Sequence, residues 1–224
     1  MTDNTRNLDE ITPKYFDDIT KTIFAPLHPV VTRQIVERCK IKEGICIDVG
    51  SGPAPLAIAL AKITDLKIHA LDISEEMCRI AEKNVETEGL SKKIVIVVAD
   101  VHDMPFPDNF ADLIVSRGSV FFWEDKVGAF KEIYRVLKPN GRTYIGGGFG
   151  TAELREKVTR EMEKIFPGWK KGVKERLGKN TVEAFKDALN DAKISNYNVI
   201  NDDSGLWIVI EKGDFIDEID KKIV

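Results

Sequence analysis

The spacing of hydrophobic residues switches repeatedly between strand-like and helical along the middle of the chain. Between residues 45 and 148, short apolar runs alternate with amphipathic stretches. The run 94–99 is apolar throughout and predicts a parallel strand buried on both faces. By contrast, Val127, Phe130 and Tyr134 recur at helical spacing. Strands that alternate with helices in this way predict an α/β fold with a doubly wound, mostly parallel sheet.

Seven strands are expected in that sheet. Five lie in the alternating region, at residues 45–49, 67–72, 94–99, 112–116 and 142–146. The last two, 196–200 and 206–211, flank the turn-rich spacer 201–205, which predicts an antiparallel hairpin at the C-terminal end. Ser74 before two glutamates, and Thr181 before an amphipathic run, are expected to cap helices.

The same pattern divides the chain into segments of a single expected domain, residues 1–224. Residues 1–40 predict an N-terminal helical lid, with Thr12 and Pro13 at the start of a helix. Residues 41–148 form the expected cofactor-binding core, residues 149–195 a helical substrate-side segment, and residues 196–224 the closing hairpin and tail.

Composition narrows the class of protein. The net charge is −4, hydrophobic residues make up 43% and charged residues 31%, as in a soluble globular enzyme. No apolar run is long enough for a bilayer, and the N-terminus lacks a secretion signal. We therefore expect a cytoplasmic protein with no membrane contact, and nucleic acid is an unlikely partner. Three scattered histidines predict no metal site.

The chemistry centres on the stretch Ile45–Pro53, where an apolar strand stops at Gly50 and Gly52. Glycines between a strand and a helix let a ligand approach the backbone and the free N–H groups of the helix. The third glycine of the dinucleotide fingerprint is replaced by Pro55, and no phosphate-binding Gly-Lys-Ser/Thr follows. These departures favour a nucleoside-like ligand without a phosphate.

Acidic residues mark the ends of three of the expected strands. Asp48 precedes the glycines, Asp72 ends the second strand and Asp100 follows the third. Ligands of open α/β sheets bind at the carboxyl ends of the strands. A carboxylate at Asp72 can accept hydrogen bonds from both ribose hydroxyls, and Asp100 can meet an adenine edge.

The chain resembles a class I (Rossmann-like) S-adenosylmethionine-dependent methyltransferase, because its motifs follow one another in the order found in that family. The resemblance covers about residues 41–148, and Ala54 departs from it where many members have glycine. The motifs that carry it are Asp48-Val49-Gly50-Ser51-Gly52-Pro53, Asp72, Ala99-Asp100 with Met104-Pro105-Phe106, Phe110-Ala111-Asp112-Leu113-Ile114, and Leu137-Lys138-Pro139-Asn140-Gly141.

The resemblance implies S-adenosyl-L-methionine as the cofactor and assigns residues to its parts. Around the methionine moiety it implies a loop of Gly50, Ser51 and Gly52, with Asp48 near the ammonium group. Ser116 and Arg117 also match positions that line this moiety and the transfer site. For the adenosine, it implies that Asp72 holds the ribose, Ile73 faces the adenine, and Asp100 with Val101 binds the adenine edge.

The activity expected from the resemblance is methyl transfer to a small-molecule acceptor by in-line displacement. A protein or RNA methyltransferase, or a non-catalytic S-adenosylmethionine-binding module, stays an alternative. His28 and Trp123 are weak candidates for catalysis or substrate contact. The glycines 146–148 predict either a loose connection or close approach of substrate. The acceptor atom, the use of a general base and a homodimer are left open.

Overall fold

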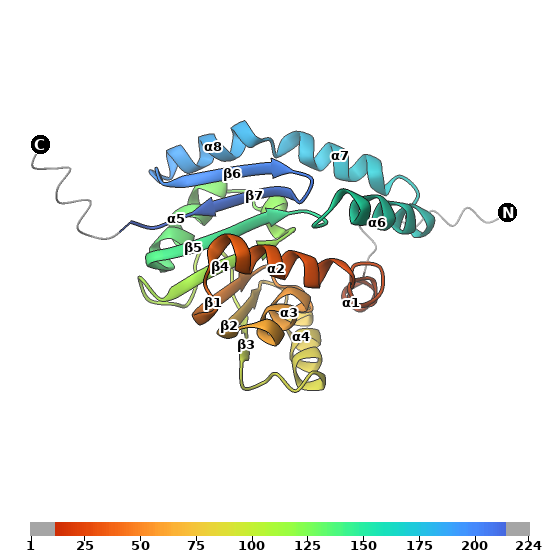
Figure 1. Ribbon diagram of the computed structural model, residues 1–224, viewed down its shortest axis with the longest axis horizontal. Coiled ribbons are helices and arrows are strands. Elements are labelled where there is room, and N and C mark those ends of the chain that lie inside the picture. Colours follow the sequence, from red (N-terminus) through yellow and green to blue (C-terminus); the bar gives the residue numbers. More distant parts are fainter. Residues whose placement is uncertain (1–11, 214–224) are drawn as a thin grey trace, which may run out of the picture.

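The computed structural model describes residues 12–213, in which one seven-stranded sheet runs through the molecule (Figure 1). The strand order is β3-β2-β1-β4-β5-β7-β6, and β7 is antiparallel to both neighbours. The strands are β1 (Glu43–Val49), β2 (Asp65–Asp72), β3 (Ile94–Val98), β4 (Ala111–Arg117), β5 (Leu137–Gly147), β6 (Tyr197–Asp202) and β7 (Gly205–Ile210). The predicted mostly parallel sheet with a C-terminal antiparallel hairpin is confirmed.

Helices cover both faces of the sheet. One core joins the sheet to α2 (Leu27–Cys39), α3 (Pro55–Ile63) and α4 (Glu75–Thr87), of which Figure 1 shows α2 and α3 on the near side. A second core lies under α5 (Lys126–Val136) and α8 (Val182–Asp191). The remaining helices are α1 (Pro13–Lys21), α6 (Ala152–Ile165), α7 (Trp169–Lys179) and the short 3-10 helix η2 (Ser119–Phe122).

The predicted helix starts are found where capping residues place them. Thr12, Ser74 and Thr181 each accept a hydrogen bond from the backbone N–H three residues on, at 3.2–3.3 Å. These bonds satisfy amides that the first turn of a helix leaves without an intrahelical partner. Local sequence therefore decides where α1, α4 and α8 begin.

The third strand corrects one prediction. The apolar run 94–99 is not buried on both faces, because β3 is the edge strand of the sheet. Val95 and Val98 are 53% and 54% exposed. Hydrophobicity indicates a strand here, but the position of that strand in the sheet is set by topology.

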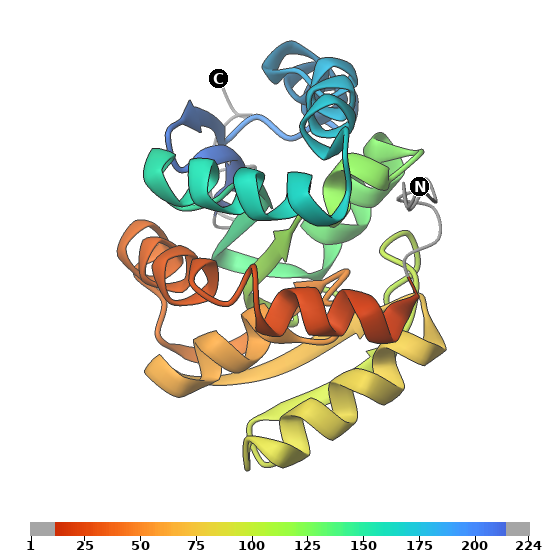
Figure 2. The ribbon, with the colours of Figure 1, turned by 90° about the vertical axis from the view of Figure 1, so that its right-hand side faces the viewer.

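The N-terminal helices and the substrate-side helices pack together over the carboxyl ends of the strands. Ile19 and Phe24 share a buried cluster with Met162, Phe166 and Trp169. Figure 2 shows α1 lying between α6 and α4 across this end of the molecule. Helix α1, the turn after it, α6 and the start of α7 thus form a common cover over the carboxyl ends of the strands, whereas α2 lies mainly on a face of the sheet.

The glycines 146–148 are explained by the fold itself. A Cβ atom added to Gly146 or Gly148 would lie about 2 Å from a carbonyl oxygen of the β6–β7 hairpin, and one on Gly147 would strike the ring of Phe121. Side chains larger than hydrogen would therefore separate β5 from β7. Of the two predicted alternatives, the loose connection is wrong, because the connection is tightly packed against its own chain. The close approach of substrate stays a prediction.

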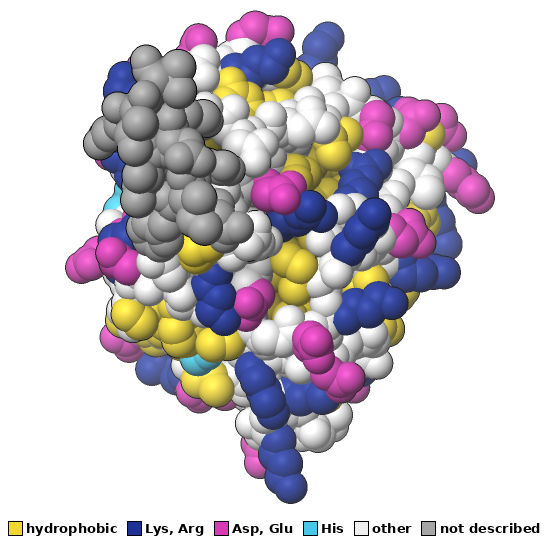
Figure 3. Space-filling model, turned by 60° about the vertical axis from the view of Figure 1, so that its left-hand side comes forward, with side chains coloured by type: hydrophobic (Ala, Val, Ile, Leu, Met, Phe, Trp, Pro, Cys, Tyr) yellow, Lys and Arg dark blue, Asp and Glu magenta, His cyan; other side chains and the backbone are white. Residues whose placement is uncertain are grey.

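Charges of both signs are mixed on the face that Figure 3 presents, with hydrophobic side chains between them. None of the helices between residues 12 and 213 combines the length and apolar content needed to cross a bilayer.

Candidate functional site

A cavity of about 420 Å³ opens at the carboxyl ends of the first three strands. Its wall combines the end of β1, the end of β2, the loop after β3 and the segment around η2. The lining residues are Val49, Gly50, Leu71, Asp72, Ile73, Ala99, Asp100, Val101, His102, Ser119, Phe122, Trp123 and Glu124. This is the sheet edge where the sequence predicts a ligand.

The glycine loop at the end of β1 is held in a conformation that favours glycine. Gly50 and Gly52 have φ values of +64° and +54°. The amide of Ser51 donates to the carbonyl of Leu71 at 2.9 Å, and the Ser119 hydroxyl donates to the carbonyl of Val49 at 3.0 Å. These bonds fix the loop against β2 and η2, so its backbone is pre-arranged at the cavity.

We expect Gly50→Ala to destabilise the fold by about 2–4 kcal/mol, because it adds left-handed strain to a steric overlap. A Cβ atom at Gly50 would lie 2.3 Å from that of Ser119. Gly89 is a matched control, since its φ of +68° is similar and nothing lies within 4 Å of its added Cβ. Gly89→Ala should cost about 1 kcal/mol. If urea denaturation shows that Gly50→Ala and Gly89→Ala lower the free energy of unfolding equally, a tight contact at Gly50 is contradicted.

Asp72 is the carboxylate best placed for a ligand. Its Oδ2 accepts from the amide of Gly52 at 2.8 Å, and its Oδ1 accepts from the amide of Ser74 at 2.9 Å. Each oxygen keeps a second lone pair. The carboxylate is thus oriented by two backbone amides and lines the cavity, which suits it to accept bonds from vicinal hydroxyls.

Asp100 lies farther along the same wall and is paired with His102. Asp100 Oδ1 accepts from the amide of His102 at 2.9 Å and lies 2.6 Å from His102 Nδ1. Burial opposes protonation of His102, but its bonds to Asp100 and to the carbonyl of Asp125 outweigh this and raise its pKa. The backbone and ring bonds to His102 lower the pKa of Asp100. An ionised carboxylate is therefore held at this end of the cavity.

Behind the glycine loop, Asp48 is 1% exposed and accepts a bond from the amide of Ala57 at 3.1 Å. Burial raises the pKa of Asp48 to about 8, against the lowering effect of that bond. The nearby Arg117 donates to the carbonyl of Gly148 and faces the ring of Phe24 at 5.4 Å. Burial lowers the pKa of Arg117 to about 10, so it stays cationic at neutral pH.

The predicted cofactor residues fall into two groups. Gly50, Asp72, Ile73, Asp100 and Val101 line the cavity. The second group does not line the cavity. Ser51 and Gly52 belong to the glycine loop, and the other three are Asp48, Ser116 and Arg117. The hydroxyl of Ser116 is buried and lies 2.6 Å from that of Ser119.

Sequence reasoning missed Ser119 as a lining residue. Ser119 follows β4 in a 3-10 turn that begins at Gly118, with φ +96°, and Gly118 is the signal that could have indicated a turn back to the glycine loop. Phe122 is 64% exposed and carries the guanidinium of Arg176 at 4.4 Å over its ring.

The two weak catalytic candidates lie in different places. Trp123 lines the cavity near Asp100, is 8% exposed and packs edge-on against Phe130. His28 is buried, with Nε2 at 3.3 Å from the carbonyl of Thr20. Burial, assisted by the charge of Arg117, lowers the pKa of His28 to about 4. Its ring is neutral at physiological pH and is a weak base.

A family model and a solved structure both place this chain in the same family. Residues 47–145 match the family model described as a methyltransferase domain. A crystal structure from Methanococcus maripaludis, itself assigned to the S-adenosyl-L-methionine-dependent methyltransferases, is 49% identical with a TM-score of 0.89, and the match covers 96% of this chain and 98% of that one. The chain belongs to the class I S-adenosylmethionine-dependent methyltransferases.

Curated relatives are matched over part of their length. The sterol 24-C-methyltransferase erg6 of Aspergillus fumigatus is 34% identical over 132 residues, which are 57% of this chain and 33% of that protein. The demethylmenaquinone methyltransferase of Geobacillus kaustophilus is 29% identical over 132 residues, 58% of this chain and 56% of that protein. This methyltransferase thus spans about a third to just over half of these relatives.

S-adenosylmethionine is the cofactor of this family, and the site in this methyltransferase fits it. Gly50 and Gly52 place no side chain on the loop, and a Cβ at Gly52 would lie 3.5 Å from the ring of Phe16 in α1. Asp72 presents an oriented carboxylate, and a buried carboxyl, Asp48, and a buried cation, Arg117, lie behind the loop. This set has the chemistry needed for a ribose and for an amino-acid zwitterion.

Proposed function

We propose that this methyltransferase transfers the methyl group of S-adenosylmethionine to a small-molecule acceptor by in-line displacement. The observation that carries the proposal is the Asp72 carboxylate, which two amides orient into a cavity that ends at the glycine loop. Asp72 would hold the ribose hydroxyls, and Ile73, Asp100 and Val101 would surround the adenine.

The methionine moiety would lie between Gly50 and the buried charges behind it. Asp48 would attract the ammonium group, Arg117 would attract the carboxylate, and Ser51, Gly52 and Ser116 would shape the loop around them. Opposite charges in a buried site stabilise a zwitterion much more than they would in water. This arrangement would fix the sulfonium end of the cofactor at the boundary with the covering helices.

S-adenosylmethionine supplies an activated methyl group, so the chain has to align an acceptor and exclude water. The cover of α1, α6 and α7 fits both tasks, since the buried cluster that holds it together is apolar and aromatic. His28 lies in α2 and does not line the cofactor cavity, and its pKa of about 4 makes it a poor general base at neutral pH. An acceptor that is already nucleophilic suits such a site.

A small acceptor is supported by two observations. The names of these two relatives specify a sterol and a demethylmenaquinone, both small molecules. The basic residues of α7, which a nucleic acid would need, include Arg176 stacked on Phe122 and Lys171 beside Glu175. A protein or RNA acceptor, or a non-catalytic binding module, is the alternative.

A measurement of methyl transfer distinguishes an enzyme from a non-catalytic S-adenosylmethionine-binding module. The purified chain with S-adenosylmethionine and a fractionated metabolite extract is expected to form S-adenosylhomocysteine in at least one small-molecule fraction. Methyl transfer that requires a protein or RNA fraction would contradict the small-acceptor proposal. Cofactor binding with no turnover in any fraction would favour the non-catalytic alternative.

A further inference from the structure

A second hollow of about 930 Å³ lies outside the cofactor site, among α1, α2, α3 and α4. We call it the helix groove. Its floor is apolar and consists of Pro53, Pro55, Ile58, Ala59, Ile63 and Ile80. The family cofactor does not account for it, because the cofactor cavity opens on the other side of the glycine loop and shares none of these residues.

Helix α3 gives the groove an unusual floor. Its inner face, Leu56, Ala57, Leu60 and Ala61, is buried against the sheet. Its outer face carries Ile58 and Ile63, and Ile63 is 48% exposed. Lys62 is the one charged residue in the nine. A helix that is apolar almost all round is expected to be covered on both sides, and an exposed apolar face marks an interaction surface.

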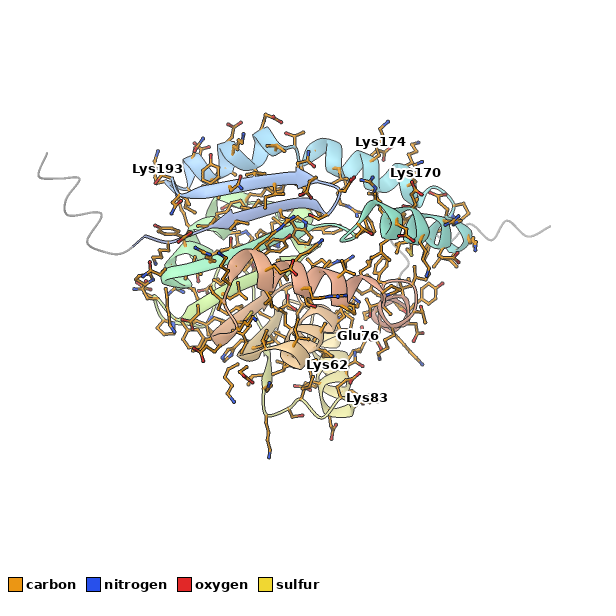
Figure 4. All side chains as sticks on the ribbon, viewed as in Figure 1. Lys62, Glu76, Lys83, Lys170, Lys174 and Lys193 are labelled. Atoms are coloured by element: carbon orange, nitrogen blue, oxygen red, sulfur yellow. The ribbon has the colours of Figure 1, made fainter. Side chains whose placement is uncertain are left out.

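The rim of the groove is basic although the chain as a whole is acidic. Six lysines and arginines line it, against three acidic residues. Figure 4 labels three of the nine, Lys62 from α3 and Glu76 and Lys83 from α4. Within residues 12–213, Lys14, Arg33 and Lys83 have no carboxylate within 4.0 Å. A complementary occupant is therefore apolar on one side and acidic at its margins.

The chain carries a segment with this pattern in its last residues, 214–224. Its apolar residues Phe215, Ile216, Ile219 and Ile223 are separated by one, three and four positions. That spacing places them on one face of a helix. The acidic residues are Asp214, Asp217, Glu218 and Asp220, against two lysines, Lys221 and Lys222, so the side chains carry a net charge of about −2. As a helix, eleven residues would be about 16 Å long, within the roughly 20 Å of the 13-residue α4.

We propose that the helix groove binds residues 214–224 of a second copy of this chain as an acidic amphipathic helix. Figure 1 shows β7 ending on the side of the sheet opposite to α1. A segment that uses its full length as a helix has no residues left to reach around the sheet of its own molecule. The apolar face would cover Ile58 and Ile63, and its acidic margins would meet Lys14, Arg33 and Lys83.

Self-association of the full-length chain tests the proposal. Sedimentation should give a mass above the 25.2 kDa of one chain, rising with concentration. Ile63→Asp in the groove and Ile219→Asp in the segment should each weaken association at least tenfold. Leu177→Asp is the control, because Leu177 is an exposed helical residue (41%) in α7, away from the groove. A monomer at every concentration, or association that survives Ile63→Asp, overturns the proposal.

A peptide identifies the occupant. A labelled peptide of residues 214–224 should bind the full-length Ile219→Asp chain, whose own segment competes poorly, and should bind at least tenfold more weakly when Ile63→Asp is added. Lys83→Glu should weaken it and reduce its salt dependence. Circular dichroism and binding of S-adenosylhomocysteine, which uses the other cavity, report folding of each variant. Equal binding with and without Ile63→Asp overturns the proposal.

Discussion

Asp72→Ala is expected to weaken binding of S-adenosylhomocysteine by about tenfold to hundredfold, with the chain still folded. The reason is the loss of the charge-assisted hydrogen bonds that we propose between Asp72 and the ribose, about 1.5–3 kcal/mol. The structure adds a second contribution, because the carboxylate also accepts from the amides of Gly52 and Ser74. Removing it releases the glycine loop, which we propose faces the methionine moiety.

Calorimetric titration measures this effect, and the same strand supplies a control. Asp65 begins β2, whereas Asp72 ends it, and its side chain is exposed beside Lys93. Asp65→Ala should leave the affinity unchanged. Asp72→Asn keeps an acceptor oxygen and should fall between wild type and Asp72→Ala. Unchanged affinity in Asp72→Ala would show that this residue does not hold the cofactor.

Asp48→Asn is expected to stabilise the unliganded fold by about 2–4 kcal/mol at pH 8. Burial raises the pKa of Asp48 to about 8, from about 4 for a free carboxyl. Between these values the folded chain binds more protons than the unfolded chain, so its free energy of unfolding falls as pH rises. Asparagine removes that ionisation and keeps an oxygen for the amide of Ala57.

Urea denaturation from pH 5 to pH 8 checks whether the free energy of unfolding changes with pH in the expected direction. The gain in stability of Asp48→Asn over wild type should be small at pH 5 and grow up to pH 8, where it levels off. Serial measurements at four pH values suffice, with Asp65→Asn as a surface control of the same chemistry. A gain that is independent of pH, or a loss at pH 8, would contradict a buried ionisable Asp48.

The same carboxyl predicts how binding depends on pH. If Asp48 attracts the ammonium group, the bound state requires its ionised form, and binding releases a proton below pH 8. The affinity for S-adenosylhomocysteine should therefore rise by up to about tenfold per unit between pH 6 and pH 8. Asp48→Asn should bind more weakly and lose most of this dependence. A wild-type affinity that is flat over this range would remove Asp48 from the methionine site.

The order of elements and the sheet edge that forms the site could be predicted because local chemistry specifies them. Thr12, Ser74 and Thr181 cap helices by bonds within three residues, and glycines end the first strand. Asp72 and Asp100 line the same cavity because parallel strands end at the same edge. Such features need no knowledge of contacts between distant segments.

The remaining features depend on packing between distant parts of the chain. The apolar pattern of β3 is the same for a central strand and an edge strand, so the exposure of Val95 and Val98 was not foreseeable. The close approach of the β6–β7 hairpin to Gly146 and Gly148 joins residues about sixty positions apart. Ser119 lines the cavity because its turn folds back onto Gly50.

The most direct test of the proposed site is a calorimetric titration of the purified chain with S-adenosylmethionine, S-adenosylhomocysteine and NAD. We predict that both sulfur nucleosides bind at a single site per chain, that NAD gives no signal, and that Asp72→Ala weakens both nucleosides. Tight binding of NAD with no response to either sulfur nucleoside would contradict the assignment of this cavity to S-adenosylmethionine.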